Sequence, residues 1–193
     1  MPRARSSFAV ILDACVLYPA PLRDLLVELA QAGLYRALWT ASIHEEWMSA
    51  VRRDRPDIPV EALERTRQLM DAHADHCLVT GYEGIIGRLA LPDPGDRHVL
   101  AAAIVGRVEA IVTFNKTDFP DEVLGSFGME AIDPDDFLSG QIDLDRAPVV
   151  TAVRRVRARL RNPPRTAREY LDALVKQRLP ATVSLLEQDI DSI

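Results

Sequence analysis

The feature that most constrains the fold of this chain is the alternation of short apolar runs with longer amphipathic segments. The run FAVILDA (8–14) is apolar and rich in β-branched residues, and it ends in an acid, as does a buried strand of a parallel sheet. The next segment, PLRDLLVELAQAG (21–33), has leucines at helical spacing, a proline at its start and a glycine at its end, so it is predicted to be a helix. Strands separated by helices of this length indicate a parallel α/β sheet with helices on both faces.

The same alternation continues to about residue 140. Further strands are predicted at 37–39, 77–80, 109–115 and 129–132, of which 77–80 is the weakest. Further helices are predicted at 41–54, 59–75 and 96–106, with a short closing helix at 133–140. In a sheet of this kind, ligands bind outside the carboxyl ends of the strands.

Both the charge and the strand pattern change near residue 140. Residues 1–140 contain 13 basic and 22 acidic residues, whereas residues 141–193 contain 10 basic and 7 acidic residues. The second part has no strand signal, and helices are predicted there at 147–162, at 166–179 with a Thr166/Glu169 capping box, and at 180–190. We therefore predict an α/β domain over residues 1–140 and a helical C-terminal extension over residues 141–193.

The cysteines and the N-terminal segment restrict the cellular setting. Cys15 and Cys77 lie in apolar runs without metal-ligand spacing, so both are expected to be small buried side chains in a reducing compartment. His73, His76 and Cys77 in HADHC lack a fourth ligand, so a zinc site is not expected there. The start MPRARSS precedes an apolar run too short for a signal sequence or a membrane span. We expect a cytoplasmic protein without membrane contact.

Four acids stand where an α/β fold exposes side chains at one edge. Asp13 ends the first strand, Asp118 follows the strand at 109–115, and Glu46 and Asp96 lie near the starts of two helices. Carboxylates that converge at such an edge repel one another unless a cation lies between them. Because all-oxygen ligands select hard cations over zinc, this pattern indicates Mg²⁺ or Mn²⁺.

The acids next to two of these residues have structural interpretations. Asp93 is followed by Pro94 and is predicted to cap the helix that contains Asp96. Ser42 and Glu45 are predicted to form a capping box, which gives Glu45 a structural role. The sequence alone leaves open which of Asp93 and Asp96, and which of Glu45 and Glu46, is the metal ligand. Three later aspartates are also interpreted as helix caps: Asp133, Asp135 and Asp136.

Four segments in this order resemble the PIN domain of metal-dependent ribonucleases and VapC-type toxins: VILDACVLYPAPLRDLL, TASIHEEW, LPDPGDRHVLAAAI and IVTFNKTDFP. The resemblance covers residues 8–140 and implies a PIN-like three-layer fold with a central, mostly parallel, twisted sheet. It also implies a four-acid catalytic and metal site, with two polar residues beside the metal. Carried over to this sequence, the acids are Asp13, Glu46, Asp96 and Asp118, and the neighbours are Thr113 and Asn115. The C-terminal helices resemble the extension of a subgroup of these toxins.

The resemblance implies a Mg²⁺- or Mn²⁺-dependent endoribonuclease that hydrolyses RNA with a metal-activated water and leaves a 5′-phosphate and a 3′-hydroxyl. It further implies a toxin of a type II toxin–antitoxin pair, with a cognate antitoxin and a homodimer as expected partners. Trp47 and Phe119 are candidates for an antitoxin groove, although core packing is favoured for both. An arginine-rich stretch is predicted to contact RNA phosphates, the alternative being a solvated helix face: Arg154, Arg155, Arg157, Arg159, Arg161, Arg165 and Arg168.

Three other interpretations compete with this one. The main alternative is a catalytically silent PIN-like scaffold that acts only by binding protein or RNA. A receiver domain, suggested by Lys116, requires an acidic pair at the first strand and a third aspartate, which this sequence lacks. A haloacid-dehalogenase phosphatase requires an aspartate at position 15, where Cys15 stands.

Overall fold

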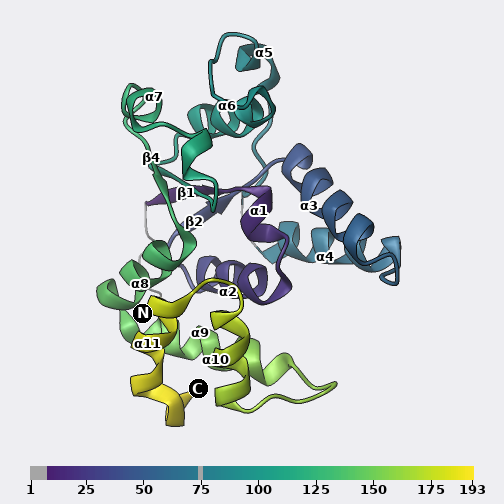
Figure 1. Cartoon of the computed structure of the whole chain (residues 1–193), viewed down its shortest axis with the longest axis vertical. Helices are drawn as coiled ribbons and strands as arrows, with labels where there is room; N and C mark the ends of the chain where they lie inside the picture. The colour runs from purple at the N-terminus through teal and green to yellow at the C-terminus, as the bar shows by residue number, and fades with distance from the viewer. Residues whose placement is uncertain (1–7, 74–75) are drawn as a thin grey trace.

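The computed structural model describes residues 8–73 and 76–193 and contains a parallel sheet at its centre (Figure 1). Its strands are β1 (Ala9–Leu12), β2 (Arg36–Leu38), β3 (Ala110–Val112) and β4 (Glu130–Ile132), in the order β2-β1-β3-β4. All three pairings are parallel, as predicted. The chain leaves β1 for β2 on one side and returns to β3 on the other, so the carboxyl ends of β1 and β3 form the topological switch point.

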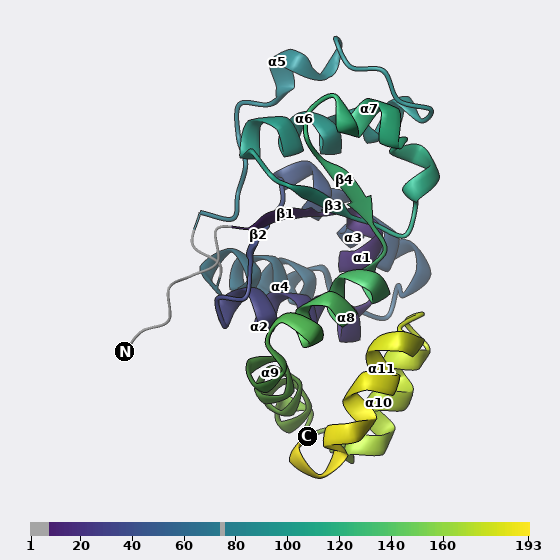
Figure 2. The same ribbon diagram turned by 90° about the vertical axis from the view of Figure 1, so that its left-hand side faces the viewer.

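Helices cover both faces of this sheet (Figures 1 and 2). One face carries α6 (Arg97–Gly106) and α7 (Asp121–Gly125), with α5 (Glu83–Ile86) beyond them. The other face carries α2 (Ala20–Gln31), α3 (Ala41–Asp54) and α4 (Val60–His73). The predicted three-layer α/β fold is confirmed.

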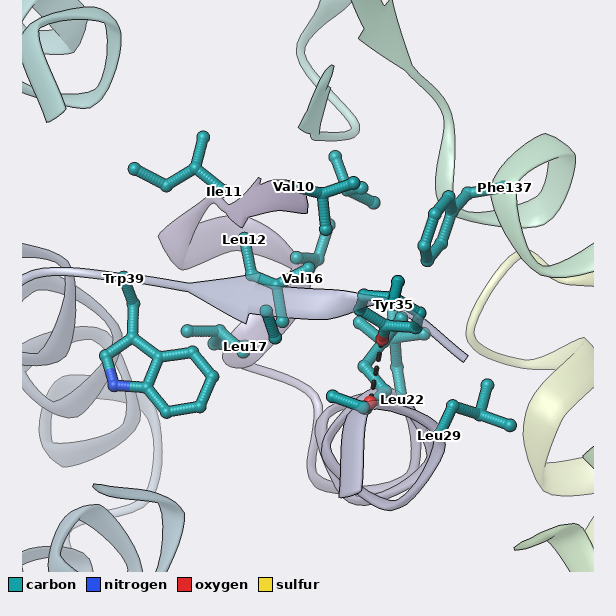
Figure 3. Close-up of a cluster of buried hydrophobic side chains, with 14 of the residues drawn as sticks. Val10, Ile11, Leu12, Val16, Leu17, Leu22, Leu29, Tyr35, Trp39 and Phe137 are labelled. Atoms are coloured by element: carbon teal, nitrogen blue, oxygen red, sulfur yellow. Dashed lines mark hydrogen bonds between the residues drawn. The ribbon is translucent and has the colours of Figure 1, made fainter. Parts of the chain in front are cut away.

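The hydrophobic core forms around β1 (Figure 3). Every residue of this strand is buried, because a central parallel strand is covered on both faces. Tyr35 fixes the side of the core next to the C-terminal helices. Its hydroxyl donates to the Leu26 carbonyl oxygen at 2.7 Å, and its ring packs edge-on against Phe137 with 4.8 Å between the ring centres.

The C-terminal part of the chain is helical, as predicted. It comprises α8 (Pro134–Leu144), α9 (Arg146–Arg159), α10 (Ala167–Val175), α11 (Pro180–Leu186) and the 3₁₀ turn η3 (Glu187–Ser192). The Thr166/Glu169 capping box is present at the start of α10. Helix α9 packs on α2, and α11 packs on α8. Because α8 continues through residue 140, the domain boundary at that position stays a prediction.

Several predicted elements differ in extent from the observed ones. The strand predicted at 8–14 ends at Leu12, because the Asp13 carboxylate caps a short helix, α1 (Ala14–Leu17), that was not predicted. The strand predicted at 77–80 is reduced to a single bridge between Leu78 and Trp39. Strand β3 is shorter than predicted and α8 is longer, and the short helices α5 and α7 were not predicted.

The predicted capping box of Ser42 and Glu45 is wrong. The cap of α3 is Thr40, whose hydroxyl accepts a hydrogen bond from the Ile43 amide at 3.0 Å. The Ser42 hydroxyl instead lies 3.0 Å from the hydroxyl of Tyr82. Since α3 begins before Ser42, Glu45 lies inside the helix, exposed to solvent.

The aspartates after β4 divide into two roles. Asp133 caps α8 by accepting from the Asp135 amide at 2.9 Å, as predicted. Asp135 is buried and caps a different helix, because its carboxylate accepts from the Ala181 and Thr182 amides at the start of α11.

Among the described helices, none combines the length and apolarity that a membrane span requires.

Candidate metal centre

The loops after β1 and β3 fix the carboxylate of Asp13, which is 6% exposed. The amide of Ala14 donates to Oδ1 at 2.6 Å, and the hydroxyl of Thr113 donates to Oδ2 at 2.7 Å. The thiol of Cys15 donates to the same Oδ2 at 3.1 Å. These donors hold Asp13 at the switch point in one orientation, as a preorganised metal ligand requires.

Asp96 lies among other acids at the same edge. Burial raises its pKa from 3.8 to about 6, and the negative charges of Asp13, Asp118, Asp93 and Glu46 add to that rise. The structure therefore brings Asp13, Glu46 and Asp118, together with Asp93, within electrostatic reach of Asp96. Such mutual repulsion is what a bound divalent cation would relieve.

The structure separates the roles of Asp93 and Asp96. Asp93 accepts from the Gly95 amide at 2.7 Å and caps the 3₁₀ turn η1 (Pro94–Asp96), with Pro94 in the first position. The predicted cap is confirmed. Asp96 precedes α6 and has no side-chain capping bond there. Its carboxylate is therefore available to a ligand.

Glu46 pairs with a histidine that the sequence interpretation missed. Oε1 of Glu46 lies 2.7 Å from Nε2 of His98, on the first turn of α6. The position of His98, two residues after Asp96 in the same motif, was the available signal. Glu46 is one of the acids whose charge raises the pKa of Asp96, which places it at this edge and favours it as the ligand.

Two histidines, His98 on α6 and His44 on α3, are expected to titrate in opposite directions. Burial lowers the pKa of His98, but the hydrogen bond to Glu46 and the nearby acids outweigh it, so the pKa is raised. Burial lowers the pKa of His44, despite its contact with Asp71. The contribution of His98 to stability is full below its unfolded pKa, near 6.5, and is lost as pH rises through its folded pKa.

Ring-nitrogen NMR of the metal-free protein tests this pair. We expect His98 to titrate above the ordinary histidine range and His44 below it, and Glu46→Gln to lower only the pKa of His98. Equal titration of the two rings would contradict the contact between His98 and Glu46.

Cys15 was interpreted as a small buried hydrophobic residue, and this interpretation is wrong. The residue is only partly buried, and its sulfur accepts from the Phe114 amide at 3.3 Å while its thiol donates to Asp13. Burial, followed by the charge of Asp13, raises the pKa of the thiol to about 12. Cys15 is therefore a neutral hydrogen-bond donor to Asp13 at the candidate metal centre.

Thr113 and the residues after it complete the edge. Thr113 is fully buried, and its hydroxyl accepts from the Asn115 amide at 3.0 Å. The side chain of Asn115 is exposed. Asp118 ends the 3₁₀ turn η2 (Lys116–Asp118) and is partly buried. Both Asp118 and Asn115 thus follow β3 at its carboxyl end, as predicted.

The oxygen donors at this edge are of the kind that a hard cation prefers. Within residues 8–73 and 76–193, no three acids, histidines or cysteines stand in an arrangement that could by itself hold a metal ion. A cation here would therefore need waters or substrate oxygens among its ligands, as is usual for Mg²⁺. An open groove of about 370 Å³, lined in part by Cys15, Glu46 and Trp47, lies beside the acids and offers room for a substrate. Of the HADHC motif, the side chain of His73 lies outside the described residues and Cys77 is buried.

Several of the arginines predicted to bind RNA make internal contacts instead. Arg159 and Arg155 pair with the buried carboxylate of Glu28 on α2, at 2.5 and 3.6 Å. Arg157 donates to the carbonyl oxygen of Arg165 at 2.9 Å. These contacts join α9 to the α/β domain and fix the loop after it.

The other arginines predicted to bind RNA, and the two aromatic residues considered for an antitoxin groove, have the following positions. Arg154 and Arg161 are exposed, and Arg168 pairs with Glu187 at 2.5 Å. A role of these arginines in RNA binding stays a prediction. Trp47 and Phe119 are fully buried, which confirms core packing for both.

Comparison with known proteins agrees with the fold described above. The PIN domain model matches residues 9–117, and the model of the VapC50 C-terminal domain matches residues 134–188. A protein of Mycobacterium tuberculosis (strain ATCC 25618 / H37Rv) named "Putative ribonuclease VapC50" is 46% identical over 83 residues, which are 42% of this chain and 48% of that protein. The chain thus spans about half the length of this relative, and no solved structure matches it. Its sequence and its fold place this chain in the PIN-domain family, with a C-terminal extension of the VapC50 type.

Proposed function

We propose that this chain is a divalent-metal-dependent endoribonuclease and the toxin of a toxin–antitoxin pair. The observation that carries the proposal is the group of acids around Asp96 at the switch point, where burial and like charge raise the pKa of that residue to about 6. The similarity to a protein named as a ribonuclease supports the choice of RNA as substrate.

In this proposal Asp13, Glu46, Asp96 and Asp118 hold Mg²⁺ or Mn²⁺. The bound cation supplies a water of lowered pKa and stabilises the leaving oxygen of the phosphodiester. Thr113 and Cys15 keep Asp13 oriented toward the cation, since both donate to its Oδ2. His98 holds Glu46 at the same edge. The protein thus contributes a preformed set of oxygens, which lowers the reorganisation needed during the reaction.

The direct test is cleavage of single-stranded RNA with Mg²⁺, with Mn²⁺ and with EDTA. We expect products with a 5′-phosphate and a 3′-hydroxyl, and no cleavage in EDTA. Cleavage that continues in EDTA, or its absence with both metals, would contradict the proposal.

Thermal unfolding in Mn²⁺ separates the enzyme from a catalytically silent scaffold. Mn²⁺ at about 100 times its dissociation constant is expected to add about 2.7 kcal/mol of stability, or roughly 5–10 °C in melting temperature. A scaffold without a metal centre should show no such rise. A monovalent salt at equal ionic strength serves as the control for non-specific screening.

The toxin role requires a partner that suppresses the activity. We expect expression of the chain to arrest growth, and co-expression of a small protein encoded in the adjacent reading frame to restore it. A homodimer is a further expectation, which sedimentation of the purified chain can test. Growth that is unaffected by an RNA-cleaving wild-type chain would contradict the toxin role and leave the ribonuclease assignment intact.

A further inference from the structure

An arginine of the C-terminal extension contacts the loop that follows β3. Arg178 is exposed and stands in the turn between α10 and α11. The central carbon of its guanidinium lies 4.5 Å from the centre of the Phe114 ring. Phe114 directly follows Thr113, whose hydroxyl binds Asp13. The extension therefore places a positive charge beside the loop that fixes the innermost acid.

Contacts of the residues that follow Arg178 determine its position. The buried carboxylate of Asp135 accepts from the Ala181 and Thr182 amides at 2.9 and 2.8 Å, which ties α11 to α8. Leu179 is fully buried. The backbone of Arg178 has a φ of 65°, in the left-handed region that residues with a side chain seldom adopt. A left-handed residue of this kind commonly follows the end of a helix, as Arg178 does after α10.

The contact with Phe114 leaves the guanidinium suited to bind an anion. Its partner is an aromatic ring and not an acceptor oxygen, so the contact takes up none of the acceptor positions that an anion would fill. This planar set of donors matches two oxygens of one phosphate. By contrast, Arg155 and Arg159 are already paired with Glu28. An RNA strand that approaches the acids needs a positive group near them to offset repulsion of its phosphates.

We propose that Arg178 binds a phosphate of the RNA strand next to the scissile bond, so that the α10–α11 turn forms one wall of the substrate-binding surface. This inference rests on the proposed ribonuclease function. It gives the C-terminal extension a direct role in binding RNA through a residue outside the arginine-rich stretch of α9.

The test compares Arg178→Gly with Arg107→Gly. Arg107 is also an exposed arginine with positive φ, at 51°, but it follows α6 and precedes β3, so it lies at the opposite edge of the sheet. Each change removes one positive charge and places glycine at a position with left-handed backbone, which glycine adopts readily. The probe is a fluorescein-labelled single-stranded RNA of about 20 nucleotides, measured by anisotropy in EDTA over a range of salt.

Loss of one phosphate contact is expected to weaken RNA binding by Arg178→Gly about fivefold at 0.1 M salt and to reduce the salt slope by about 0.7. KM for cleavage in Mg²⁺ should rise by a similar factor, with kcat nearly unchanged. Arg107→Gly should bind and cleave like the wild type. The melting temperatures of both variants should remain near that of the wild type. If Arg178 had a purely structural role, the melting temperature of Arg178→Gly would fall.

Several results would overturn the inference. One is an RNA affinity of Arg178→Gly equal to that of the wild type. Another is an equal loss of RNA affinity in Arg178→Gly and Arg107→Gly, which would indicate a general effect of charge. In either case cleavage by the wild type would leave the ribonuclease function standing. A wild-type chain that neither binds nor cleaves RNA would refute both proposals. If Arg178→Gly does not fold, Arg178→Gln replaces it with the same expected loss.

Discussion

Replacing Asp96 by asparagine is expected to raise the melting temperature of the metal-free protein while abolishing its metal-dependent activity. The ionised Asp96 is disfavoured by burial and by the neighbouring acids, and its pKa is therefore raised to about 6. Asparagine removes that charge and its repulsion. Since this carboxylate is only partly buried, we expect a gain of about 1–2 kcal/mol, or roughly 2–8 °C. Loss of a ligand should lower the cleavage rate at least about 10²-fold.

The pH dependence of stability follows from the same pKa. In the unfolded chain Asp96 loses its proton near pH 4, whereas in the folded protein it keeps the proton to about pH 6. The metal-free wild type therefore loses stability as pH rises from about 4 to 6. Below about pH 4, Asp96 is protonated in both states, and its charge no longer destabilises the folded protein. Asp96→Asn should lack this loss. Denaturant unfolding at several pH values in EDTA measures both effects.

Asp93→Asn is the matched control on the same turn. An asparagine oxygen can still accept from the Gly95 amide and cap η1, so stability and activity should change little. Full activity of Asp96→Asn together with loss of activity in Asp93→Asn would show that the two roles are exchanged. An unchanged rise in melting temperature with Mn²⁺ in Asp96→Asn would exclude Asp96 as a ligand.

Replacing Asp13 by asparagine is expected to abolish activity to a similar degree, but with the opposite effect on stability. Asp13 accepts three hydrogen bonds, from Ala14, Thr113 and Cys15. Asparagine has an amide nitrogen in place of one carboxylate oxygen, so its side chain cannot accept all three hydrogen bonds. A lost hydrogen bond to a buried charged group costs about 1.5–3 kcal/mol. The melting temperature should therefore fall, while the cleavage rate drops by about 10²-fold or more.

Thermal unfolding and RNA cleavage by the folded fraction test this difference. A Cys15→Ser variant, which retains a donor to Asp13, is the control for general disturbance of the loop and should keep most of the activity. If purified Asp13→Asn cleaves RNA at the wild-type rate, the metal centre is wrongly assigned. If it is more stable than the wild type in EDTA, repulsion among the acids outweighs the hydrogen bonds of Asp13.

Much of the fold could be predicted from the sequence because local patterns specify its elements. The apolar run that forms β1, the leucine spacing of α2 and the Thr166/Glu169 capping box each appear in the structure. Errors arose where a side chain competed with the pattern. Asp13 starts a helix that ends β1 early, and Thr40 caps α3 in place of Ser42. A single hydrogen bond moves such a boundary by a few residues, which apolar periodicity does not register.

The sequence by itself determined the α/β architecture, the helical extension and the acids expected at one edge of the sheet, because strand order and helix placement follow from hydrophobic spacing and parallel winding. Only the tertiary structure decided which polar groups meet there. It paired His98 with Glu46, turned Cys15 toward Asp13 and brought Arg178 onto Phe114 across 64 positions of the chain. These contacts join residues that are distant or out of phase along the sequence, and they form only when the packed helices fix the positions of both partners.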